Sequence, residues 1–191
     1  MADRFKLALR NSCRQIRETL PTSYQQTASN QVCSRIRSMK YYRYAKRIAL
    51  YKPVGGEISL KTLWDSAPLQ GKFCYYPVLN NDKTLSFLPA TPATSFVNNK
   101  YGIPEPDVDR KTAIPVQELD IIFMPLVAFD EKGTRLGMGA GYYDRTLANE
   151  NPPLLIGVAY EFQHQLHIEA QPWDVPLTAI VTPRAIYWSK P

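Results

Sequence analysis

Several features that characterise large classes of protein are missing from this sequence. No run of about eighteen apolar residues occurs, so a transmembrane helix is not predicted. Residues 1–6 include no apolar segment of the secretory type, and a cytoplasmic location is expected. Only three cysteines are present, Cys13, Cys33 and Cys74, without a Cys-x-x-Cys pair. This scarcity argues against a disulfide framework or a zinc site and indicates free thiols, buried or half-buried.

Signatures of nucleophilic catalysis are absent too, because no Ser/His/Asp or Cys/His pattern is recognisable. The two histidines, His164 and His167, are three positions apart, a spacing that suits a pair of metal ligands on a helix. No third ligand stands near them in the sequence, so a metal site is not predicted there.

The positive charge is concentrated at the start of the chain. The net charge is +6, but residues 1–47 contain eleven Lys and Arg against two acids, a net of +9. Residues 48–191 contain twelve against fifteen, a net of −3. A basic front end predicts an anionic partner, either a nucleic acid or a small molecule with phosphates or carboxylates.

The hydrophobic pattern alternates between helices and apolar strands. An amphipathic helix is predicted over residues 4–19, ended by Pro21, with Thr22 or Ser23 capping a second helix that extends to about Met39. Further helices are expected over 58–67 and 141–150. Strands are expected at 47–51, 72–78, 85–88, 119–125, 154–160 and 179–181, with a hairpin over 128–136 and a long ordered loop over 89–118.

Strands that are apolar throughout and alternate with helices are typical of a sheet that is covered on both faces. No internal repeat or low-complexity tract interrupts the pattern. We therefore predict a single α/β domain over residues 1–191, built as a three-layer sandwich around a mostly parallel sheet.

The most informative segment is residues 137–144, with the sequence Gly-Met-Gly-Ala-Gly-Tyr-Tyr-Asp. Three glycines at alternate positions allow tight turns and bring backbone N–H groups close to a ligand. A helix that starts directly after them would direct further free N–H groups to the same place, an arrangement suited to phosphate. The spacing matches neither the Walker loop nor the dinucleotide fingerprint. A flexible turn without a ligand is the alternative.

Asp144 stands in the first turn of that predicted helix, and two interpretations of it are open. A carboxylate there complements the helix dipole, which is worth roughly 0.3–1 kcal/mol. Beside a triphosphate it could instead hold Mg²⁺, which takes one or two carboxylates together with phosphate oxygens. The residues alone do not separate these two roles.

Longer stretches of the sequence resemble one enzyme family. The most specific match is Arg135-Leu136-Gly137-x-Gly139-x-Gly141-Tyr142-Tyr143-Asp144, preceded by Phe123-Met124-Pro125. Supporting matches are Lys6-x-x-x-Arg10, Gly56-Glu57-Ile58, residues 101–106 and Asp174-Val175-Pro176-Leu177. Over nearly the whole chain, these segments resemble the 5-formyltetrahydrofolate cyclo-ligases, also called methenyltetrahydrofolate synthetases.

The resemblance implies an α/β sandwich related to sugar-phosphate isomerases and coenzyme A transferases. It also implies an ATP- and Mg²⁺-dependent conversion of 5-formyltetrahydrofolate to 5,10-methenyltetrahydrofolate, with release of ADP and phosphate. In this reaction the formyl oxygen would be phosphorylated, and N10 would attack the activated carbon. The expected partners are these two small molecules. A monomer is expected, without a membrane or nucleic-acid partner.

The resemblance also assigns roles to individual positions. Lys6 and Arg10, one helical turn apart, would contact the ATP phosphates. Arg135 and Asp144 would take part in catalysis, and Asp144 would share the metal with Asp174. The folate would contact Glu57 and Tyr142. The triphosphate would be cradled by Arg135, Leu136, Gly137, Met138, Gly139, Ala140, Gly141, Tyr142 and Tyr143.

Simpler structural roles remain open for several of these positions. Glu57 could be an acid at the start of the helix that follows it, and Asp174 could be a turn or N-cap residue. Two further cations of the first helix, Arg14 and Arg17, are interpreted as solvated surface residues.

The sequence departs from the family pattern at three positions. Met138 and Ala140 stand where many members have Arg or Lys, which predicts altered affinity rather than lost activity. Thr178 stands where an Asp is common, which weakens any two-aspartate cluster in the loop of Asp174.

Two rival functions are considered. The same fold could bind a different phosphorylated metabolite. Alternatively, the basic helices and the tyrosines at positions 41, 42 and 44 could bind a nucleic acid through charge and stacking. These tyrosines are expected instead to pack against the sheet.

Overall fold

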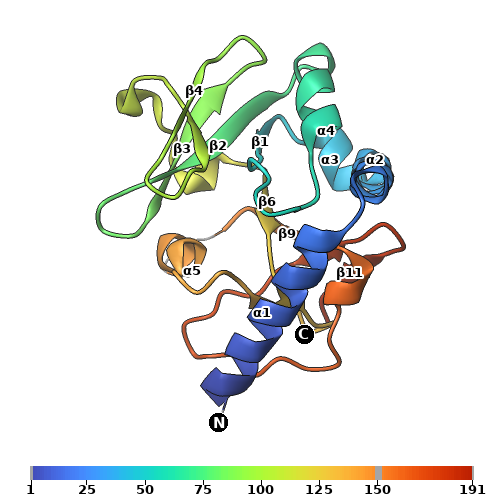
Figure 1. Cartoon of the computed structure of the whole chain (residues 1–191). Helices are drawn as coiled ribbons and strands as arrows, with labels where there is room; N and C mark the ends of the chain where they lie inside the picture. Colours follow the sequence, from blue (N-terminus) through green and yellow to red (C-terminus); the bar gives the residue numbers. More distant parts are fainter. Residues whose placement is uncertain (1, 149–151, 191) are drawn as a thin grey trace.

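A computed structural model describes residues 2–148 and 152–190 (Figure 1). Its centre is a seven-stranded sheet in the order β11-β10-β9-β6-β1-β2-β3. The parallel strands are β1 (Arg47–Ala49), β2 (Phe73–Leu79), β6 (Ile121–Pro125), β9 (Leu154–Val158) and β10 (Ala179–Val181). The edge strands β3 (Leu85–Ala90) and β11 (Ile186–Trp188) are antiparallel to their neighbours. The predicted α/β class and mostly parallel sheet are confirmed.

Side chains that alternate along the strands build two cores, one on each face of the sheet. Ile48, Phe123 and Ile156 belong to the core that also includes buried residues of α2, α3 and α4. Ala49 and Ile122 belong to the core on the other face, together with residues of α5 and of the hairpin β7–β8. Figure 1 shows α2, α3 and α4 on one side of the sheet and α5 on the other. The bounds are α2 (Thr22–Ser38), α3 (Lys40–Tyr44), α4 (Lys61–Ser66), α5 (Tyr142–Leu147), β7 (Ala128–Phe129) and β8 (Arg135–Leu136).

Helix α1 (Ala2–Thr19) confirms the predicted amphipathic helix, and in Figure 1 it runs diagonally across the lower part of the molecule. It is fixed there by a small apolar cluster in which Cys13 packs with Val127, Leu136 and Ile168. The predicted capping of α2 by a hydroxyl is wrong. Its N-cap is Pro21, without a side-chain cap bond, because Thr22 is already the first helical residue.

The segment predicted as a long loop, 89–118, is more regular than expected. It contains the hairpin of β4 (Phe96–Asn98) and β5 (Pro104–Pro106) and two short 3₁₀ turns, Arg110–Thr112 and Val116–Glu118. The side chain of Asn99 organises the hairpin turn by accepting from the N–H groups of Tyr101 and Ile103, at 2.9 and 3.1 Å. Strands of three residues are too short to produce a readable period.

Other boundaries also differ from the sequence predictions. Helix α4 is shorter than the predicted 58–67, and neither α3 nor β11 was predicted. The last part of the predicted helix 141–150 lies outside the described residues. Among the three tyrosines expected to pack against the sheet, Tyr42 is buried, but Tyr41 and Tyr44 are exposed because α3 presents only one face to the core. The three cysteines are buried free thiols, as predicted.

The order of the strands contains a topological switch point between β1 and β6. From β1 the chain proceeds through β2 to β3 in one direction, and from β6 through β9 to β10 in the other. In open α/β sheets, ligands bind outside the carboxyl ends of the strands at such a point. In the part of the chain that the structure describes, no helix combines the length and apolarity needed to cross a bilayer.

Candidate functional site

A cavity of about 940 Å³ opens at the switch point. Its lining includes residues at or soon after the carboxyl ends of β1 and β6, namely Tyr51, Lys52, Pro125 and Leu126. The site residues expected from the sequence all line it, and these are Lys6, Arg10, Glu57, Arg135, Leu136, Gly137, Met138, Gly139, Ala140, Gly141, Tyr142, Tyr143, Asp144 and Asp174. The fold therefore brings together segments from the first helix to the last loop.

The glycine segment forms an open turn between β8 and α5. Gly139 has φ +102° and Gly141 has φ +67°, a left-handed region that favours glycine. A Cβ at Gly137 would meet no atom within 4 Å, so this backbone is free of packing. Residues 138–140 are exposed.

Two cations of α1 face this turn. Arg10 Nε donates to the Gly137 carbonyl oxygen at 2.9 Å, and its guanidinium lies 3.8 Å from the Cβ position of Gly139. Lys6, one helical turn earlier, is buried at the cavity wall. This end of the cavity therefore combines two positive side chains with an exposed turn of glycine-rich backbone, which suits a polyanion.

Arg135 and Asp144 form an ion pair at the same end, with 2.6 Å between Nη2 and Oδ1. Asp144 Oδ1 also accepts from the Val175 N–H at 3.1 Å, and Arg135 donates to the Val175 carbonyl oxygen. Asp144 is thus held by specific partners, so complementing a helix dipole does not account for it alone. Both contacts use Oδ1.

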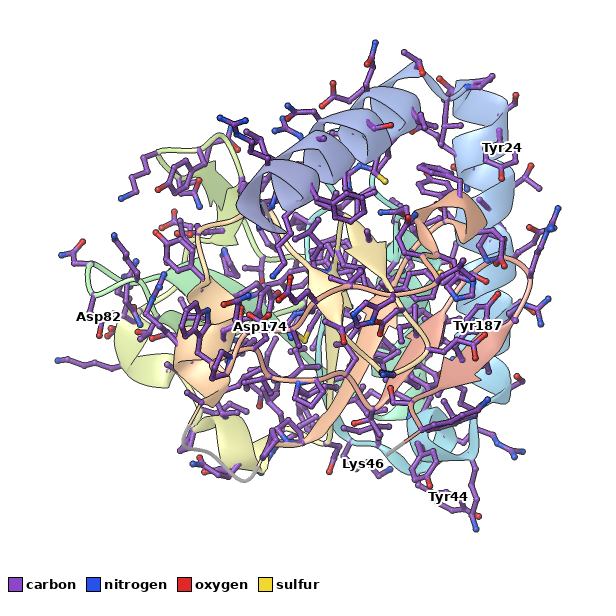
Figure 2. The ribbon with its side chains drawn as sticks, turned by 90° about the horizontal axis from the view of Figure 1, so that it is seen from below. Tyr24, Tyr44, Lys46, Asp82, Asp174 and Tyr187 are labelled. Atoms are coloured by element: carbon purple, nitrogen blue, oxygen red, sulfur yellow. The ribbon has the colours of Figure 1, made fainter. Side chains whose placement is uncertain are left out.

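Asp174 stands in the loop opposite, near the middle of the face shown in Figure 2. Its Oδ2 accepts from the Gln171 N–H at 2.8 Å, and its own N–H donates to the Gln171 carbonyl at 3.0 Å. The turn role is therefore real, although the side chain also lines the cavity. Thr178 does not line the cavity; its backbone N–H donates to the Leu155 carbonyl oxygen.

The donor set at this end fits Mg²⁺ better than zinc. Two carboxylates, Asp144 and Asp174, face one cavity. No group of three or more His, Cys, Asp or Glu side chains suited to a metal occurs among residues 2–148 and 152–190. Mg²⁺ needs only one or two carboxylates when phosphate oxygens and waters complete its shell. His164 is stacked on the Phe129 ring, with 5.0 Å between centroids, and has a packing role.

A second glycine turn presents Glu57 to the other end of the cavity. Gly55 and Gly56 have φ +52° and +74°. Glu57 Oε2 accepts from the Val54 N–H at 3.1 Å, and burial raises the pKa of Glu57 to about 7 although Arg17 opposes the shift. The first turn of α4 begins only at Lys61, so the interpretation of Glu57 as a helix-start acid is wrong.

The interpretation of Arg17 as a surface cation is also wrong. Only 2% of Arg17 is exposed, and Nε donates to the Gly55 carbonyl at 2.7 Å. Its neighbour Arg14 is exposed and pairs with Glu18, as expected for a solvated residue. The two arginines have the same local sequence signal, and only the fold distinguishes them.

Aromatic residues line the remaining walls. Tyr142 is hydrogen-bonded to Tyr101, and this bond raises the pKa of Tyr142 above its ordinary value. Burial, reinforced by Glu57, raises the pKa of Tyr143 well above its ordinary range. Tyr101 belongs to the 101–106 segment that supported the family resemblance, but sequence reasoning gave it no role.

Lys52 is a further cavity residue that the sequence did not indicate. Its Nζ lies 3.7 Å from the ring centroid of Trp64 and 3.8 Å from that of Phe96. Burial lowers the pKa of Lys52. A lysine three positions after the end of β1 was the available signal. Its aromatic partners belong to α4 and β4, and the sequence does not show that these elements meet.

Comparisons with known proteins agree with this geometry. Residues 2–183 match the model of the 5-formyltetrahydrofolate cyclo-ligase family. A relative of that name from Haemophilus influenzae is 42% identical over 91% of this chain and 95% of its own length. The cyclo-ligase of Escherichia coli K12 is 36% identical over 91% of this chain and 98% of its own length.

Solved structures give the same result. The 5,10-methenyltetrahydrofolate synthetase of Aquifex aeolicus superimposes with a TM-score of 0.85 and 31% identity, covering 97% of this chain and 93% of that one. The synthetase from Mycoplasma pneumoniae superimposes with a TM-score of 0.76 and 26% identity, covering 93% and 98%. With the family model matching most of its length, this chain belongs to the 5-formyltetrahydrofolate cyclo-ligase family.

Proposed function

We propose that this enzyme converts 5-formyltetrahydrofolate to 5,10-methenyltetrahydrofolate at the expense of MgATP, releasing ADP and phosphate. One observation carries the proposal: a single cavity is lined by a glycine turn that contacts Arg10 and by a buried carboxylate, Glu57, that pairs with Arg17 further along the same helix. Its volume of about 940 Å³ is near the upper end of the range for small-molecule sites, about 300–1,000 Å³. Two substrates that must react with each other require such an undivided space.

The nucleotide is assigned to the end formed by α1 and residues 135–141. Lys6 and Arg10 supply positive charge from consecutive turns of one helix, and the exposed turn at 138–140 supplies backbone amides. Met138 and Ala140 add no charge, so phosphate binding here depends on the backbone and on the helix cations. Mg²⁺, held by Asp144 and Asp174, would neutralise charge on the triphosphate.

The folate is assigned to the end formed by Glu57 and the tyrosines. The amino group and ring N–H of a 2-amino-4-oxo pteridine are adjacent donors, and an ionised carboxylate accepts from two such donors at once. Glu57 provides this acceptor in a largely buried position, where a charged hydrogen bond is strong. Tyr142 and Tyr143 offer flat apolar surface beside it.

The chemistry requires positioning rather than a protein nucleophile. The formyl oxygen attacks the γ-phosphorus of ATP, the bond to ADP breaks, and the formyl carbon becomes a good electrophile. N10 of the same molecule then attacks that carbon, and phosphate leaves with the former formyl oxygen. Lys6, Arg10 and Arg135 stabilise the charge that develops on the transferring group. Arg135 is held in place for this role by Asp144 and Val175.

The test is incubation of the protein with 5-formyltetrahydrofolate, with and without MgATP, while the near-ultraviolet absorbance of the methenyl product is followed. Product should form only when folate, ATP and Mg²⁺ are all present. Equal rates without ATP, or no product with all three, would contradict the proposal.

The nucleic-acid alternative has less support. Of the five α1 cations, Lys6 and Arg17 are buried, Arg10 donates to a backbone carbonyl and Arg14 pairs with Glu18, so only part of this charge is free for a duplex or a strand. A salt-titrated RNA-binding assay beside the turnover assay separates the two functions. A monomeric, cytoplasmic enzyme without a membrane partner completes the proposal, and size-exclusion chromatography tests the monomer.

A further inference from the structure

Arg17, in the last turn of α1, reaches the turn that carries Glu57. Its Nε donates to the Gly55 carbonyl oxygen at 2.7 Å, and its Nη1 lies 3.6 Å from Glu57 Oε1. Nη1 also donates to the carbonyl oxygen of Leu126, directly after β6, at 3.4 Å. A buried guanidinium is costly unless such partners are in place, so this arrangement is specific.

The backbone of α1 fixes the same turn. A Cβ built on Gly56 would lie 2.5 Å from the carbonyl oxygen of Arg17, so only glycine allows the helix end to come this close. On the opposite side, the Tyr160 hydroxyl donates to the Gly56 carbonyl at 2.9 Å. The Glu57 carboxylate is then held at Oε1 by Arg17 and at Oε2 by the Val54 N–H.

The groups that face Glu57 differ in charge. The three phenols Tyr51, Tyr143 and Tyr160 are neutral at neutral pH, as phenols ordinarily are, and burial raises the pKa of each further. Arg17 supplies the positive charge in this environment. Burial raises the pKa of Glu57 to about 7 even beside Arg17, so removing the cation would leave this carboxyl largely protonated at neutral pH.

We propose that Arg17 is a positioning residue for the folate: it holds the Glu57 carboxylate in place at the cavity wall and provides its counter-charge. The inference rests on the proposed function, in which Glu57 binds the folate. It also gives α1 two tasks. Lys6 and Arg10 of this helix face the glycine turn at 137–141, and Arg17 in its last turn holds the Glu57 carboxylate.

The first experiment compares Arg17→Met with Arg14→Met, a matched control on the exposed face of the same helix. Arg17→Met should raise KM for 5-formyltetrahydrofolate about 30-fold, because a buried partner of the carboxylate is lost. KM for ATP should change less than about 3-fold, and Arg14→Met should leave both near wild type. Equal increases for the two substrates in Arg17→Met would overturn the assignment.

A double-mutant cycle tests whether Arg17 acts through Glu57. If it does, adding Arg17→Met to Glu57→Gln should raise KM for the folate less than about 3-fold further. A full 30-fold increase in the Glu57→Gln background would identify a general structural role and sink the proposal. Wild-type turnover of 5-formyltetrahydrofolate, measured in parallel, tests the proposed function independently.

The pH dependence of kcat/KM for the folate separates loss of the counter-charge from a general structural defect, because a structural defect alone would not shift the acidic limb. In Arg17→Met, the acidic limb of kcat/KM for the folate should shift upward by about one pH unit, because the counter-charge of Glu57 is gone. Arg17→Lys keeps the charge without the planar fork, so the limb should stay in place while KM for the folate rises about 5-fold. This variant also covers the case in which Arg17→Met does not fold. An unmoved limb in a folded Arg17→Met protein, or a wild-type KM in Arg17→Lys, would contradict the inference.

Discussion

The two ends of the cavity each use a glycine turn to deliver one acid, but the turns work in opposite ways. The Gly55–Gly56 turn is pressed against the end of α1 and fixed by Arg17 and Tyr160. The turn at 137–141 stands open, and Gly137 has no neighbour within 4 Å of its Cβ position. Glycine serves close packing in the first turn and bare backbone in the second, which fits a rigid pocket for a heterocycle and an adaptable cradle for phosphates.

The two acids differ in the same way. Glu57 is buried, and its pKa is raised to about 7 by desolvation. Asp144 keeps partial exposure and a 2.6 Å ion pair with Arg135. A carboxylate beside a guanidinium and solvent is suited to hold a metal, whereas a buried one is suited to accept hydrogen bonds from a neutral ring.

The largest effect is expected at the open end. Asp144→Ala should lower kcat about 10³-fold, because it removes a proposed Mg²⁺ ligand and the partner of Arg135. Asp65→Ala, which removes an exposed acid of α4, should leave turnover within about 2-fold. Turnover and its Mg²⁺ dependence are measured by product absorbance. Near-normal turnover by Asp144→Ala would contradict the proposed metal role of Asp144, which distinguishes it from Glu57.

A substitution in the packed Gly55–Gly56 turn should lower the stability of the protein. Gly56→Ala is expected to lower the free energy of unfolding by about 3 kcal/mol, combining left-handed strain with a clash against the α1 carbonyl. Gly102 is the matched control, because it has the same φ of +74° but no atom within 4 Å of its Cβ position. Gly102→Ala should cost about 1 kcal/mol, from strain alone. Equal losses in denaturant titrations would show that packing against α1 is unimportant.

Titration of the buried Glu57 should affect the pH dependence of kcat/KM for the folate. The pKa of Glu57 is raised to about 7, so the carboxylate form gains as pH rises through 7. If that form binds the folate, kcat/KM should be about 10-fold lower at pH 6 than at pH 8. Glu57→Gln should flatten this limb and raise KM for the folate. A limb that persists in Glu57→Gln would assign the titration to another group.

The smallest effects are expected within the open turn. Gly139 has φ +102°, so Gly139→Ala should distort the turn and raise KM for ATP about 5-fold. Gly137 has neither positive φ nor a close neighbour, and Gly137→Ala should change KM for ATP less than about 2-fold. A larger effect at Gly137 than at Gly139 would mean that the alternation of glycines has another cause.

The sequence predicted the long features of the fold and the composition of the site. Apolar strands such as 119–125 and the basic amphipathic first helix were recognisable because their periods extend over many residues. The glycine segment at 137–141 was recognisable because its glycines stand at alternate positions, and two of them have the positive φ that favours glycine. Each predicted site residue lines the cavity, although their individual roles stay proposals.

What the sequence did not predict depends on contacts between distant segments. Arg14 and Arg17 have similar surroundings along the chain, and only the docking of α1 onto the 55–57 turn buries one of them. The aromatic partners of Lys52 come from α4 and β4, and β4 was too short to be predicted. The short strands β4, β5 and β11 acquire their regularity from pairing rather than from local pattern.

The bond from Arg10 to Gly137 joins residues 127 positions apart. Helix α1 is translated before β7, β8 and Ile168, onto which it docks. The end of the cavity that we propose for the nucleotide is therefore completed only when most of this sequence has been translated. Fragments that stop before residue 137 contain Lys6 and Arg10 but lack the glycine turn opposite them, so we expect such fragments not to bind ATP.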